Sequence, residues 1–498
     1  YQVNDQNIVQ LMTNTYLHGY RLSAFYNSVY MDTFYKSFKE SNRQLFEEIR
    51  TKMREGKPSS LIEMNLLTFN YSSSNYDRWI KDMDKEFATV LRSDEFLSIL
   101  SKYVDSVVDL HSIYRQAGFP VDSIDTFFNS SQKQIMSFLS ISKEFDSTPH
   151  EVLYRNGKVR LLHYVPYKGD QKNQEGLTNI HSQGPNDGDE STAKPSLLMV
   201  YAPINRFHIL DINRDKSIVA QFLRKGIDVY LLDWGYPDKN KDRLSINDYI
   251  NYIDEAVQII QKRKGIPARS DRTSKDNSIN KSNKISLLGY CWGGVFALIY
   301  CALNNNIIRN LILMATPVDF SKDNTILTEW SRALDTDKTV EEFGHIDGQI
   351  LDLGFIMRNP PRYLFDKYLK FFRKLDDKKF VDTFFSVEKW LYDTPPIPGN
   401  LYLQLINDCY RKNTLISNSM MISGKQIDLR KVNVPLLTIV AERDDLVSPE
   451  SSLAVNSYVS SIDKTDMKNP GGHVGLCISS LAHEKLWPEV TEWIFTRN

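Results

Sequence analysis

The segment between residues 150 and 315 is built of short apolar runs that alternate with helical patterns. The runs that predict buried strands are 159–165, 196–201, 227–233, 285–289 and 307–314. The patterns that predict helices between them are 217–225, 246–262 and 295–303. Strands that are apolar on both faces need cover on both faces, and strands that alternate with helices pair in parallel. The sequence therefore predicts an α/β fold with a parallel sheet between two layers of helices.

The alternation stops at about residue 318 and resumes only with the apolar run 434–440. The segment 318–430 has helical spacing and is rich in aromatic residues: Trp330, Phe343, Phe355, Phe365, Phe371, Phe372, Phe384, Phe385 and Trp390. An insertion inside a parallel sheet usually covers the carboxyl ends of the strands, where the sites of α/β proteins lie. We therefore expect residues 318–430 to form a large helical cap.

The first 145 residues show helical patterns and no alternation. Tyr26, Tyr30, Phe34 and Phe38 recur every four residues, and further stripes begin at Trp79 and at the predicted helix start Ser93-Asp94-Glu95. This stretch has no cysteine and no catalytic constellation. We expect an all-helical region at 1–145, followed by the catalytic domain at 146–498.

Composition excludes several classes of function. The 61 Lys and Arg residues nearly balance the 62 Asp and Glu residues, which gives no electrostatic case for a nucleic-acid partner. The four cysteines form no CxxC pair, and no His/Cys cluster has zinc spacing, so no metal site is predicted. So few cysteines in a long chain indicate a reducing compartment. No apolar run reaches the roughly 18 residues of a membrane span.

The turn after the predicted strand 285–289 reads Gly289-Tyr290-Cys291-Trp292-Gly293-Gly294. The nucleophile elbow of α/β-hydrolases, G-x-S-x-G, lies between a strand and a helix, and its tight turn requires small residues two positions away on each side. Gly289 and Gly293 meet that requirement, and Cys291 replaces the serine. The positive N-terminal end of the helix favours the thiolate. An isolated cysteine is more often structural, but this context predicts that Cys291 is the nucleophile.

The catalytic acid of this fold follows the nucleophile along the chain and lies just after a strand. The apolar run 434–440 is followed by three carboxylates. We assign the acid to Asp444 and keep Asp445 and Glu442 as alternatives.

The histidine of this fold comes last in the chain. His473 lies in the glycine-rich loop Pro470-Gly471-Gly472-His473-Val474-Gly475, ahead of a final predicted helix. We assign the general base to His473. His483 has a helix-face position and receives no role.

An oxyanion hole needs two backbone N–H groups beside the nucleophile. One is expected from Trp292, the residue after Cys291. The other is expected from the loop after the predicted strand 196–201, which reads Pro203-Ile204-Asn205-Arg206. Ile204 and Asn205 are equally good candidates for this second donor.

From Thr148 to its end, the chain resembles the catalytic subunit of polyhydroxyalkanoate synthases, and most closely the class III type. The motifs that carry the resemblance are YRNGKVRL (154–161), YAPINR (201–206), DVYLLDWG (228–235), GYCWGG (289–294), ATPVDF (315–320), EKW (388–390) and PGGHVG (470–475). So many motifs in one order make the resemblance specific.

The resemblance implies that Cys291 is acylated, that His473 is its base and that Asp444 orients the histidine. One position departs from the family, which usually reads Asp-His where this chain has Asp444-Asp445. A second carboxylate therefore stands beside the acid and could take its place.

Class III synthases work with a separate helical partner subunit. Residues 1–145 are similar to that partner, notably in Tyr76-Asp77-Arg78-Trp79 and from Phe96 to Pro120. Two interpretations stay open: a natural fusion of partner and catalytic subunit, or an extension particular to one lineage.

The resemblance further implies an acyltransferase that polymerises (R)-3-hydroxyacyl-CoA, of short chain such as 3-hydroxybutyryl-CoA, into a polyester and releases CoA. The thioester is the substrate, and no cofactor is implied. The expected partners are the growing polyester, the granule surface, and a second copy of the chain or a partner subunit. The implied location is the cytoplasm, at polyester granules.

Two alternatives belong to other classes of function. A cysteine hydrolase of the dienelactone hydrolase type has a similar Gly-Tyr-Cys turn, but such enzymes are about half as long and lack a large helical insertion. A granule-coat protein without catalysis would use the aromatic N-terminal helices. The order Cys291, Asp444, His473 argues against that second alternative.

Overall fold

A computed structural model of the chain describes residues 88–116, 147–165, 194–237, 243–266, 283–359 and 367–497, together with the isolated positions 14, 17, 18, 21, 85, 145, 362 and 363. The apolar stripe of Tyr26 to Phe38 and the start of the stripe at Trp79 lie outside the described residues.

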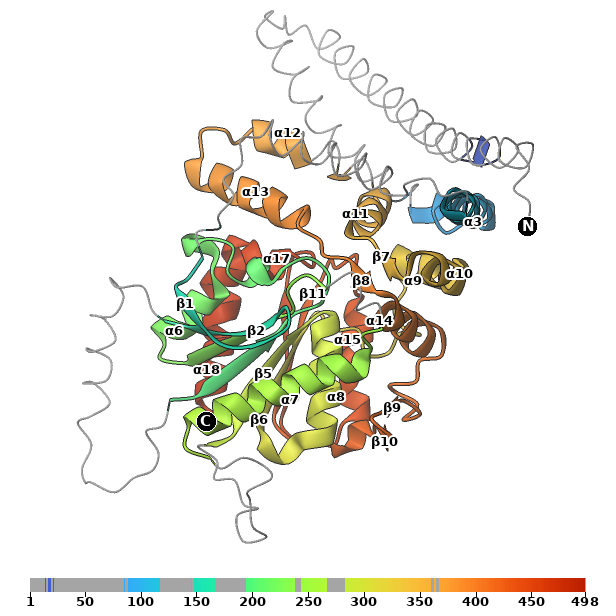
Figure 1. Ribbon diagram of the computed structural model, residues 1–498. Helices are drawn as coiled ribbons and strands as arrows, with labels where there is room; N and C mark the ends of the chain where they lie inside the picture. Colours follow the sequence, from blue (N-terminus) through green and yellow to red (C-terminus); the bar gives the residue numbers. More distant parts are fainter. Residues whose placement is uncertain are drawn as a thin grey trace, which may run out of the picture. The chain divides into compact units, whose positions relative to one another are not determined.

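An eight-stranded sheet in the order β1-β2-β4-β3-β5-β6-β11-β12 forms the centre of the catalytic region (Figure 1). Its strands are β1 (His150–Asn156), β2 (Val159–Tyr164), β3 (Ser196–Val200), β4 (Asp228–Asp233), β5 (Ile285–Tyr290), β6 (Ile308–Met314), β11 (Leu436–Ala441) and β12 (Lys464–Asn469). Strand β2 is antiparallel to β1 and β4, and the pairs from β4 to β12 are parallel. This strand order is that of the α/β-hydrolase fold, so the predicted fold class is confirmed.

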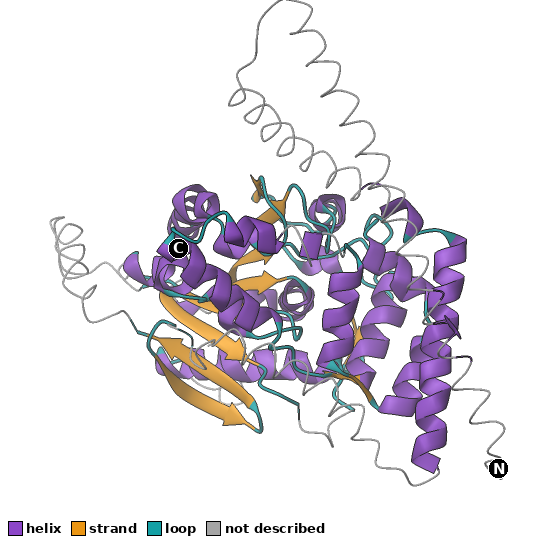
Figure 2. Cartoon of the chain, turned by 90° about the horizontal axis from the view of Figure 1, so that it is seen from above, coloured by secondary structure: helices purple, strands orange, loops and turns teal. Residues whose placement is uncertain are grey.

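Helices cover both faces of this sheet. Helix α6 (Ile218–Arg224) packs with α18 (Trp487–Phe495), and α7 (Ile246–Arg263) packs with α8 (Trp292–Asn304). The two pairs lie on opposite sides of the strands, as Figures 1 and 2 show. The layer arrangement follows from the alternating sequence pattern, because each amphipathic helix buries one face against the sheet.

Local sequence signals define where these helices begin. The Ser217 side chain accepts a hydrogen bond from Ala220 N at the start of α6. Ser245 and Asp248 form a reciprocal capping box at the start of α7. Helix α8 is different, because its first eleven residues are all buried and apolar or glycine, which places it in the middle of the core.

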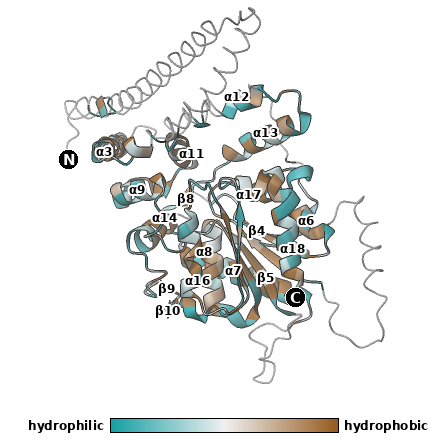
Figure 3. Cartoon of the chain, turned by 180° about the vertical axis from the view of Figure 1, so that it is seen from behind, coloured by the Kyte–Doolittle hydropathy of each residue, from teal (hydrophilic) through white to brown (hydrophobic). Residues whose placement is uncertain are grey.

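The central strands are buried along their whole length. The side chains of β3, β5 and β11 are buried at every position, as the hydrophobic colouring of the strands in Figure 3 also indicates. The predicted runs 196–201, 285–289 and 307–314 therefore correspond to β3, β5 and β6 within one or two residues. Short apolar runs identify strands of this kind because both of their faces are covered.

Two strands at the sheet edges were not predicted. Strand β1 is mostly exposed, and β12 alternates exposed and half-buried residues, with Lys464, Asp466 and Lys468 on its outer side. Neither sequence contains an apolar run, because an edge strand with one solvated face does not need one. Strand β12 matters for the site, since it leads into the loop of His473.

The insertion between β6 and β11 is largely helical, as predicted. It contains α9 (Ile326–Ala333), α10 (Thr336–Phe343), α11 (Gly348–Met357), α12 (Lys367–Phe372), α13 (Lys378–Leu391), α14 (Gly399–Gln404) and a π-helix, η8 (Leu405–Arg411). A short ladder joins distant parts of it, β7 (His345–Ile346) with β8 (Ile397–Pro398), and β9 (Met421–Ile422) pairs with β10 (Lys425–Gln426) in a short hairpin. Below, residues 318–430 are called the insertion.

The chain divides into two compact units. One comprises Tyr1–Thr126, Ala333–Glu342 and Leu353–Lys378, and the other comprises Phe127–Arg332, Phe343–Asp352 and Lys379–Asn498. Within the first unit, α3 (Asp94–Gln116) begins at the predicted helix start, and its Asp109 forms an ion pair of 2.8 Å with Lys338. The N-terminal residues thus group with parts of the insertion. The domain boundary near residue 145 stays a prediction.

Among the described residues, no helix is both long and apolar enough to cross a membrane.

Candidate active site

Three loops at the carboxyl ends of parallel strands carry the three residues that the sequence assigned to catalysis. Cys291 follows β5, Asp444 lies shortly after β11, and His473 follows β12. The carboxyl ends of parallel strands share one edge of the sheet, where α/β enzymes place their sites. Chemistry-bearing residues that are far apart in the sequence are thereby brought together.

The backbone of Cys291 adopts the sharp turn of a nucleophile elbow. Its φ of 56° and ψ of −128° lie in a region that side-chain-bearing residues rarely occupy. Cys291 N donates to Met314 O at 2.9 Å, which continues the pairing of β5 with β6, and Gly294 N donates to Cys291 O at 2.9 Å, which begins the helix. The strand and the helix therefore meet at one residue, whose side chain is partly exposed.

The glycines around Cys291 are required by close contacts. A Cβ added at Gly289 would lie 2.4 Å from Gly294 Cα, and one at Gly294 would lie 1.8 Å from Thr316 Oγ1. A Cβ at Gly293 would lie 2.4 Å from Val200 O, at the end of β3. The first turn of α8 therefore rests directly on the end of β3. This contact places the loop after β3, with Ile204 and Asn205, beside the elbow.

His473 and Asp444 form a buried pair. His473 Nδ1 lies 2.8 Å from Asp444 Oδ2, and their side chains are 7% and 2% exposed. The other oxygen of Asp444 accepts hydrogen bonds from Leu446 N at 2.9 Å and Val447 N at 3.0 Å. Both carboxylate oxygens are thus used, one by the ring and one by the turn, which fixes the orientation of the ring. Glu442, the more distant alternative acid, is exposed.

Electrostatics around His473 favour its protonated form. Burial by itself would lower the pKa of His473, but the charges of Asp444 and Cys291 and the hydrogen bonds with both raise it to about 10. Because Nδ1 is engaged by Asp444, Nε2 is the nitrogen left for the thiol of Cys291. The ring can therefore take the thiol proton and hold it as an imidazolium.

The side chain of Tyr290 packs against His473. Its ring stacks on the His473 imidazole at 5.0 Å between centroids, and its hydroxyl lies 3.4 Å from His473 O. Burial raises the pKa of Tyr290 well above its usual value, so the phenol stays neutral. Tyr290 thus supports the ring without competing for protons.

The residue after the nucleophile is held from the insertion. Trp292 Nε1 donates to the hydroxyl of Tyr410, in η8, at 3.0 Å. Burial raises the pKa of Tyr410 well above its usual range, and the nearby carboxyl of Asp323 and the thiol of Cys291 add to the rise. A neutral phenol from the insertion therefore lies beside the elbow.

The loop after β3 is also held from the insertion. Asn205 is buried and has a φ of 58°, and its side-chain amide donates to Thr394 Oγ1 at 2.5 Å and to Leu391 O at 3.0 Å. The indole of Trp390 donates to Arg206 O at 2.6 Å. Ile204, the other candidate oxyanion donor, precedes Asn205 in this anchored loop and is half-buried.

The structure brings Cys291, Asp444 and His473 together, and the first turn of α8, with Trp292, rests on the end of β3 that leads into the 203–206 loop. His483 lies elsewhere, between Gln221 Nε2 and Cys477 O at 2.7 Å each, and burial lowers its pKa to about 4. Tyr410 and Thr394 were not predicted from the sequence. Tyr410 lies 118 positions from Trp292, and no short motif marks either residue.

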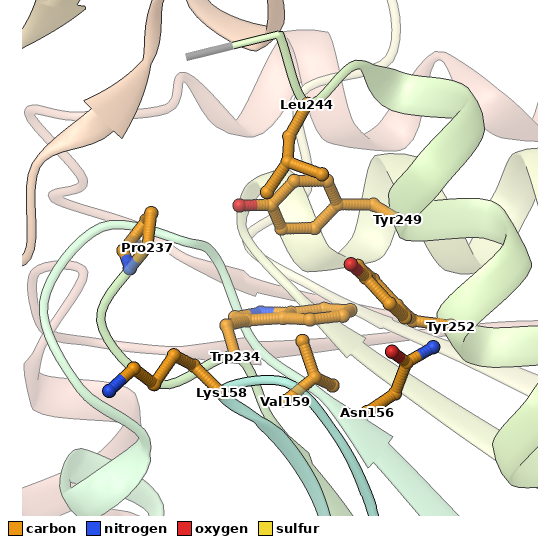
Figure 4. Close-up of a pocket in the computed structure, with 8 residues that line it drawn as sticks. All are labelled: Asn156, Lys158, Val159, Trp234, Pro237, Leu244, Tyr249 and Tyr252. Atoms are coloured by element: carbon orange, nitrogen blue, oxygen red, sulfur yellow. The ribbon is translucent and has the colours of Figure 1, made fainter. Parts of the chain in front are cut away.

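A separate apolar pocket includes Trp234, the residue directly after β4. Figure 4 shows the indole of Trp234 between Leu244 and Tyr249 on one side and Val159 on the other. The pocket is lined by Asn156, Lys158, Val159, Trp234, Pro237, Leu244, Tyr249 and Tyr252. None of the three predicted catalytic residues borders it. Among the described residues, no group of three or more His, Cys, Asp or Glu side chains is arranged to hold a metal ion.

Comparison with protein families gives one match in the C-terminal part of the chain. The family described as "PHB de-polymerase C-terminus" matches residues 353–498, which include the positions of Asp444 and His473.

Curated relatives cover most of the chain. It is 35% identical over 372 residues to "Poly(3-hydroxyalkanoate) polymerase subunit PhaC" of Haloferax mediterranei, which covers 74% of this chain and 67% of the relative. It is 36% identical to the protein of the same name from Allochromatium vinosum, over 60% of this chain and 81% of the relative. A third, from Synechocystis sp., is 33% identical over 70% of this chain and 85% of the relative.

Among solved structures, a monoacylglycerol lipase of Paleococcus ferrophilus matches 61% of this chain and 97% of its own, with 15% identity and a TM-score of 0.36. A likeness at this level adds nothing to the strand order described above.

Proposed function

Because this chain belongs to the family of poly(3-hydroxyalkanoate) polymerase subunits, we propose that it polymerises (R)-3-hydroxyacyl units from their CoA thioesters, with Cys291 as the acylated residue. The activity is that of an acyltransferase. The observation that carries the proposal is the buried pair of His473 and Asp444 beside the elbow of Cys291.

The first step of the proposed reaction loads one acyl unit. The Cys291 thiol gives its proton to His473 Nε2, and the thiolate attacks the thioester carbonyl. The negative charge on the carbonyl oxygen is held by backbone N–H groups of Trp292 and of the 203–206 loop. The carbon–sulfur bond to CoA then breaks, and His473 returns the proton to the CoA sulfur as it leaves.

The second step forms the ester. The 3-hydroxyl of another unit gives its proton to His473, and its oxygen attacks the acyl group on Cys291. The carbon–sulfur bond to Cys291 breaks, and the thiolate takes the proton back. A thiol suits this reaction because thiolate–thioester exchange is nearly balanced, so the acyl-enzyme retains the energy needed for ester formation.

Polymerisation requires that water does not intercept the acyl-enzyme. Buried aromatic residues of the insertion, including Phe320, Trp390 and Tyr410, support this requirement. The proposed reaction needs no cofactor, because the CoA thioester is itself the substrate.

Three further proposals, on acyl chain length, location and assembly, rest on the resemblance of the sequence to class III polyhydroxyalkanoate synthases. We propose a preference for short acyl chains such as 3-hydroxybutyryl, action in the cytoplasm at the surface of polyester granules, and assembly with a second copy of the chain or a partner subunit. Residues 1–145, for which the sequence predicts helices, are the segment proposed to take the role of that partner, ahead of a catalytic domain at 146–498.

The test is to supply the purified chain with 3-hydroxybutyryl-CoA and to measure free CoA and product together. Chloroform-soluble polyester in proportion to CoA release supports the proposal. CoA release with free 3-hydroxybutyrate as the product would instead assign the chain to the cysteine hydrolases. No CoA release from thioesters of any chain length would refute both.

A further inference from the structure

We propose that the insertion positions both halves of the oxyanion hole, through Tyr410 on the Trp292 side and through Thr394 on the Asn205 side. The inference rests on the proposed function, because it concerns how Cys291 is acylated. It gives the insertion a second task besides excluding water. Tyr410 and Thr394 would be positioning residues, which act on the reacting atoms only through their neighbours.

On the first side, one hydrogen bond fixes the side chain of Trp292. An indole has a single polar atom, which can only donate, and Trp292 Nε1 donates to Tyr410 Oη at 3.0 Å. Tyr410 is itself fixed, since its backbone oxygen accepts from Arg332 Nε at 3.3 Å and its ring packs on Phe320 at 4.7 Å. Trp292 also supplies the predicted backbone donor, so restraint of its side chain restrains that N–H.

On the second side, the amide of Asn205 is held by one turn of the insertion. Its Nδ2 donates to Thr394 Oγ1 at 2.5 Å and to Leu391 O at 3.0 Å, with Trp390 O at 3.3 Å. Asn205 has a φ of 58°, an unfavourable conformation for a residue with a side chain. Such a conformation persists where the surroundings hold it, and these hydrogen bonds supply that hold.

Helix α11 contacts Thr394 through Asp352 and Gly348. Its hydroxyl donates to Asp352 Oδ1 at 2.5 Å while it accepts from Asn205. Asp352 is 7% exposed. A Cβ added at Gly348, the first residue of α11, would lie 1.9 Å from Thr394 O, so the helix packs directly against this residue. A hydroxyl is required at position 394, because the group must donate and accept at once.

These contacts matter because an oxyanion hole works only at a defined distance. Its donors must lie about 2.7–3.1 Å from the position of the charged oxygen in the transition state. A displacement of about 1 Å can cost about 100-fold in rate. Loosening either anchor should therefore slow attack on a carbonyl, while the reactivity of the thiolate itself is unchanged.

The experiment compares two reactions of the same thiol. The first is CoA release from 3-hydroxybutyryl-CoA in a single turnover, which passes through an oxyanion. The second is alkylation by iodoacetamide, a displacement at a saturated carbon that needs the thiolate but forms no oxyanion. Cys301, Cys409 and Cys477 are fully buried, so labelling reports Cys291.

For the Asn205 side, Thr394→Val removes the hydroxyl at nearly constant shape, and Thr394→Ser retains it. We expect Thr394→Val to slow CoA release about 10- to 100-fold with KM and alkylation unchanged. Thr394→Ser should recover most of the rate. The matched control is Thr491→Val, which deletes a buried threonine hydroxyl bonded to Trp487 O at 2.7 Å in α18, away from the site.

For the Trp292 side, Tyr410→Phe removes the acceptor of the indole. Its control is Tyr300→Phe, which deletes a hydroxyl bonded to Asp254 Oδ1 at 2.8 Å near the other end of α8. Both variants should lower thermal stability to a similar degree. Only Tyr410→Phe should slow CoA release relative to alkylation.

Equal loss of acylation and alkylation in Thr394→Val and Tyr410→Phe would overturn the inference, because the damage would then lie in the thiolate or the fold. So would normal acylation in both variants. If one side alone shows the selective loss, the inference fails for the other side. Failure of the proposed function looks different, because the native chain itself would then release no CoA or would yield free 3-hydroxybutyrate in place of polymer.

Discussion

The sheet and the insertion hold the catalytic centre in different ways. On the sheet side, backbone pairing fixes the reactive groups: Cys291 N binds Met314 O, and the loops of Asp444 and His473 are joined by the bonds of Glu442 N to Asn469 O and Arg443 N to Gly471 O. On the insertion side, the restraints are made by single side chains such as Tyr410 and Thr394. Backbone pairing tolerates substitution of most side chains, whereas a contact between two side chains is lost with either of them.

The difference suggests a division of work. The sheet supplies the groups that make and break bonds, and the insertion adjusts where the carbonyl oxygen is held. Substitutions on the sheet side should therefore abolish chemistry, and those on the insertion side should reduce its efficiency.

The largest effect is expected for Cys291→Ala. Loss of the nucleophile should lower CoA release by about 10⁴-fold or more and abolish polymer, while the far-ultraviolet circular dichroism and melting temperature stay near those of the native chain. Near-normal CoA release by a folded Cys291→Ala protein would contradict the entire assignment of the site.

The next effect concerns which of two adjacent carboxylates belongs to the sheet-side machinery. Asp444→Asn should lower turnover on the order of 10³-fold, because His473 loses the partner that orients it and stabilises its charge. Asp445→Asn should change turnover far less, since both oxygens of Asp444 already serve the ring and the turn. The reverse ranking would transfer the role to Asp445, and equal effects would indicate a coupled pair.

A smaller effect is expected in the dependence of stability on pH. The pKa of His473 is raised in the folded chain to about 10, above the usual 6.5 of a histidine side chain. Its pairing therefore stabilises the fold fully below pH 6.5 and loses that contribution as the pH rises through 10. The difference in urea midpoint between the native chain and Asp444→Asn should accordingly be largest near pH 6 and shrink towards pH 10.

The control for this measurement is the same pair of proteins in a Cys291→Ala background, which removes the other partner of His473 and leaves Asp444 as the group compared. A midpoint difference that stays constant from pH 6 to pH 10 would show that Asp444 stabilises the fold through its turn alone.

The two regions also differ in how far the sequence predicted them. The elbow of Cys291 and the loop of His473 could be predicted because each is recognised from a few consecutive residues, a turn that follows a strand and precedes a helix. The sheet order gives them their partners, and the order Cys, Asp, His is a property of the fold. The sequence assigned the acid to Asp444 and kept Asp445 as an alternative, because adjacent residues of one turn differ only in direction. The structure shows that Asp444 is the residue bonded to His473.

The contacts of the insertion were not predicted, for a physical reason. Tyr410 meets Trp292 across 118 positions, and Thr394 meets Asn205 across 189. Periodicity indicates which face of a helix is buried but not what it is buried against. The edge strand β12 was missed for a related reason, because its solvated face gives it no apolar run.

The smallest effect on acylation is expected from removal of residues 1–145. Cys291, Asp444, His473, Tyr410 and Thr394 all belong to one compact unit, which begins at Phe127. Most of the removed segment, Tyr1–Thr126, groups instead with the insertion segments Ala333–Glu342 and Leu353–Lys378.

A chain that starts near Asp146 should therefore fold and load Cys291 at a nearly normal rate but elongate several-fold more slowly, because those insertion segments lose their neighbours. Single-turnover CoA release would measure loading, and the mass of polymer would measure elongation. The fragment 1–145 added in trans should restore part of the elongation rate.

The exposed ion pair of Asp109 with Lys338 is too weak to explain such an effect alone, since pairs of this kind contribute about 1 kcal/mol or less. Asp109→Asn therefore serves as the control that stays near the native rate. If loading falls as far as elongation, the N-terminal residues support the sheet side as well, and the boundary near 145 is wrong. If elongation is undiminished, the region is not a fused partner.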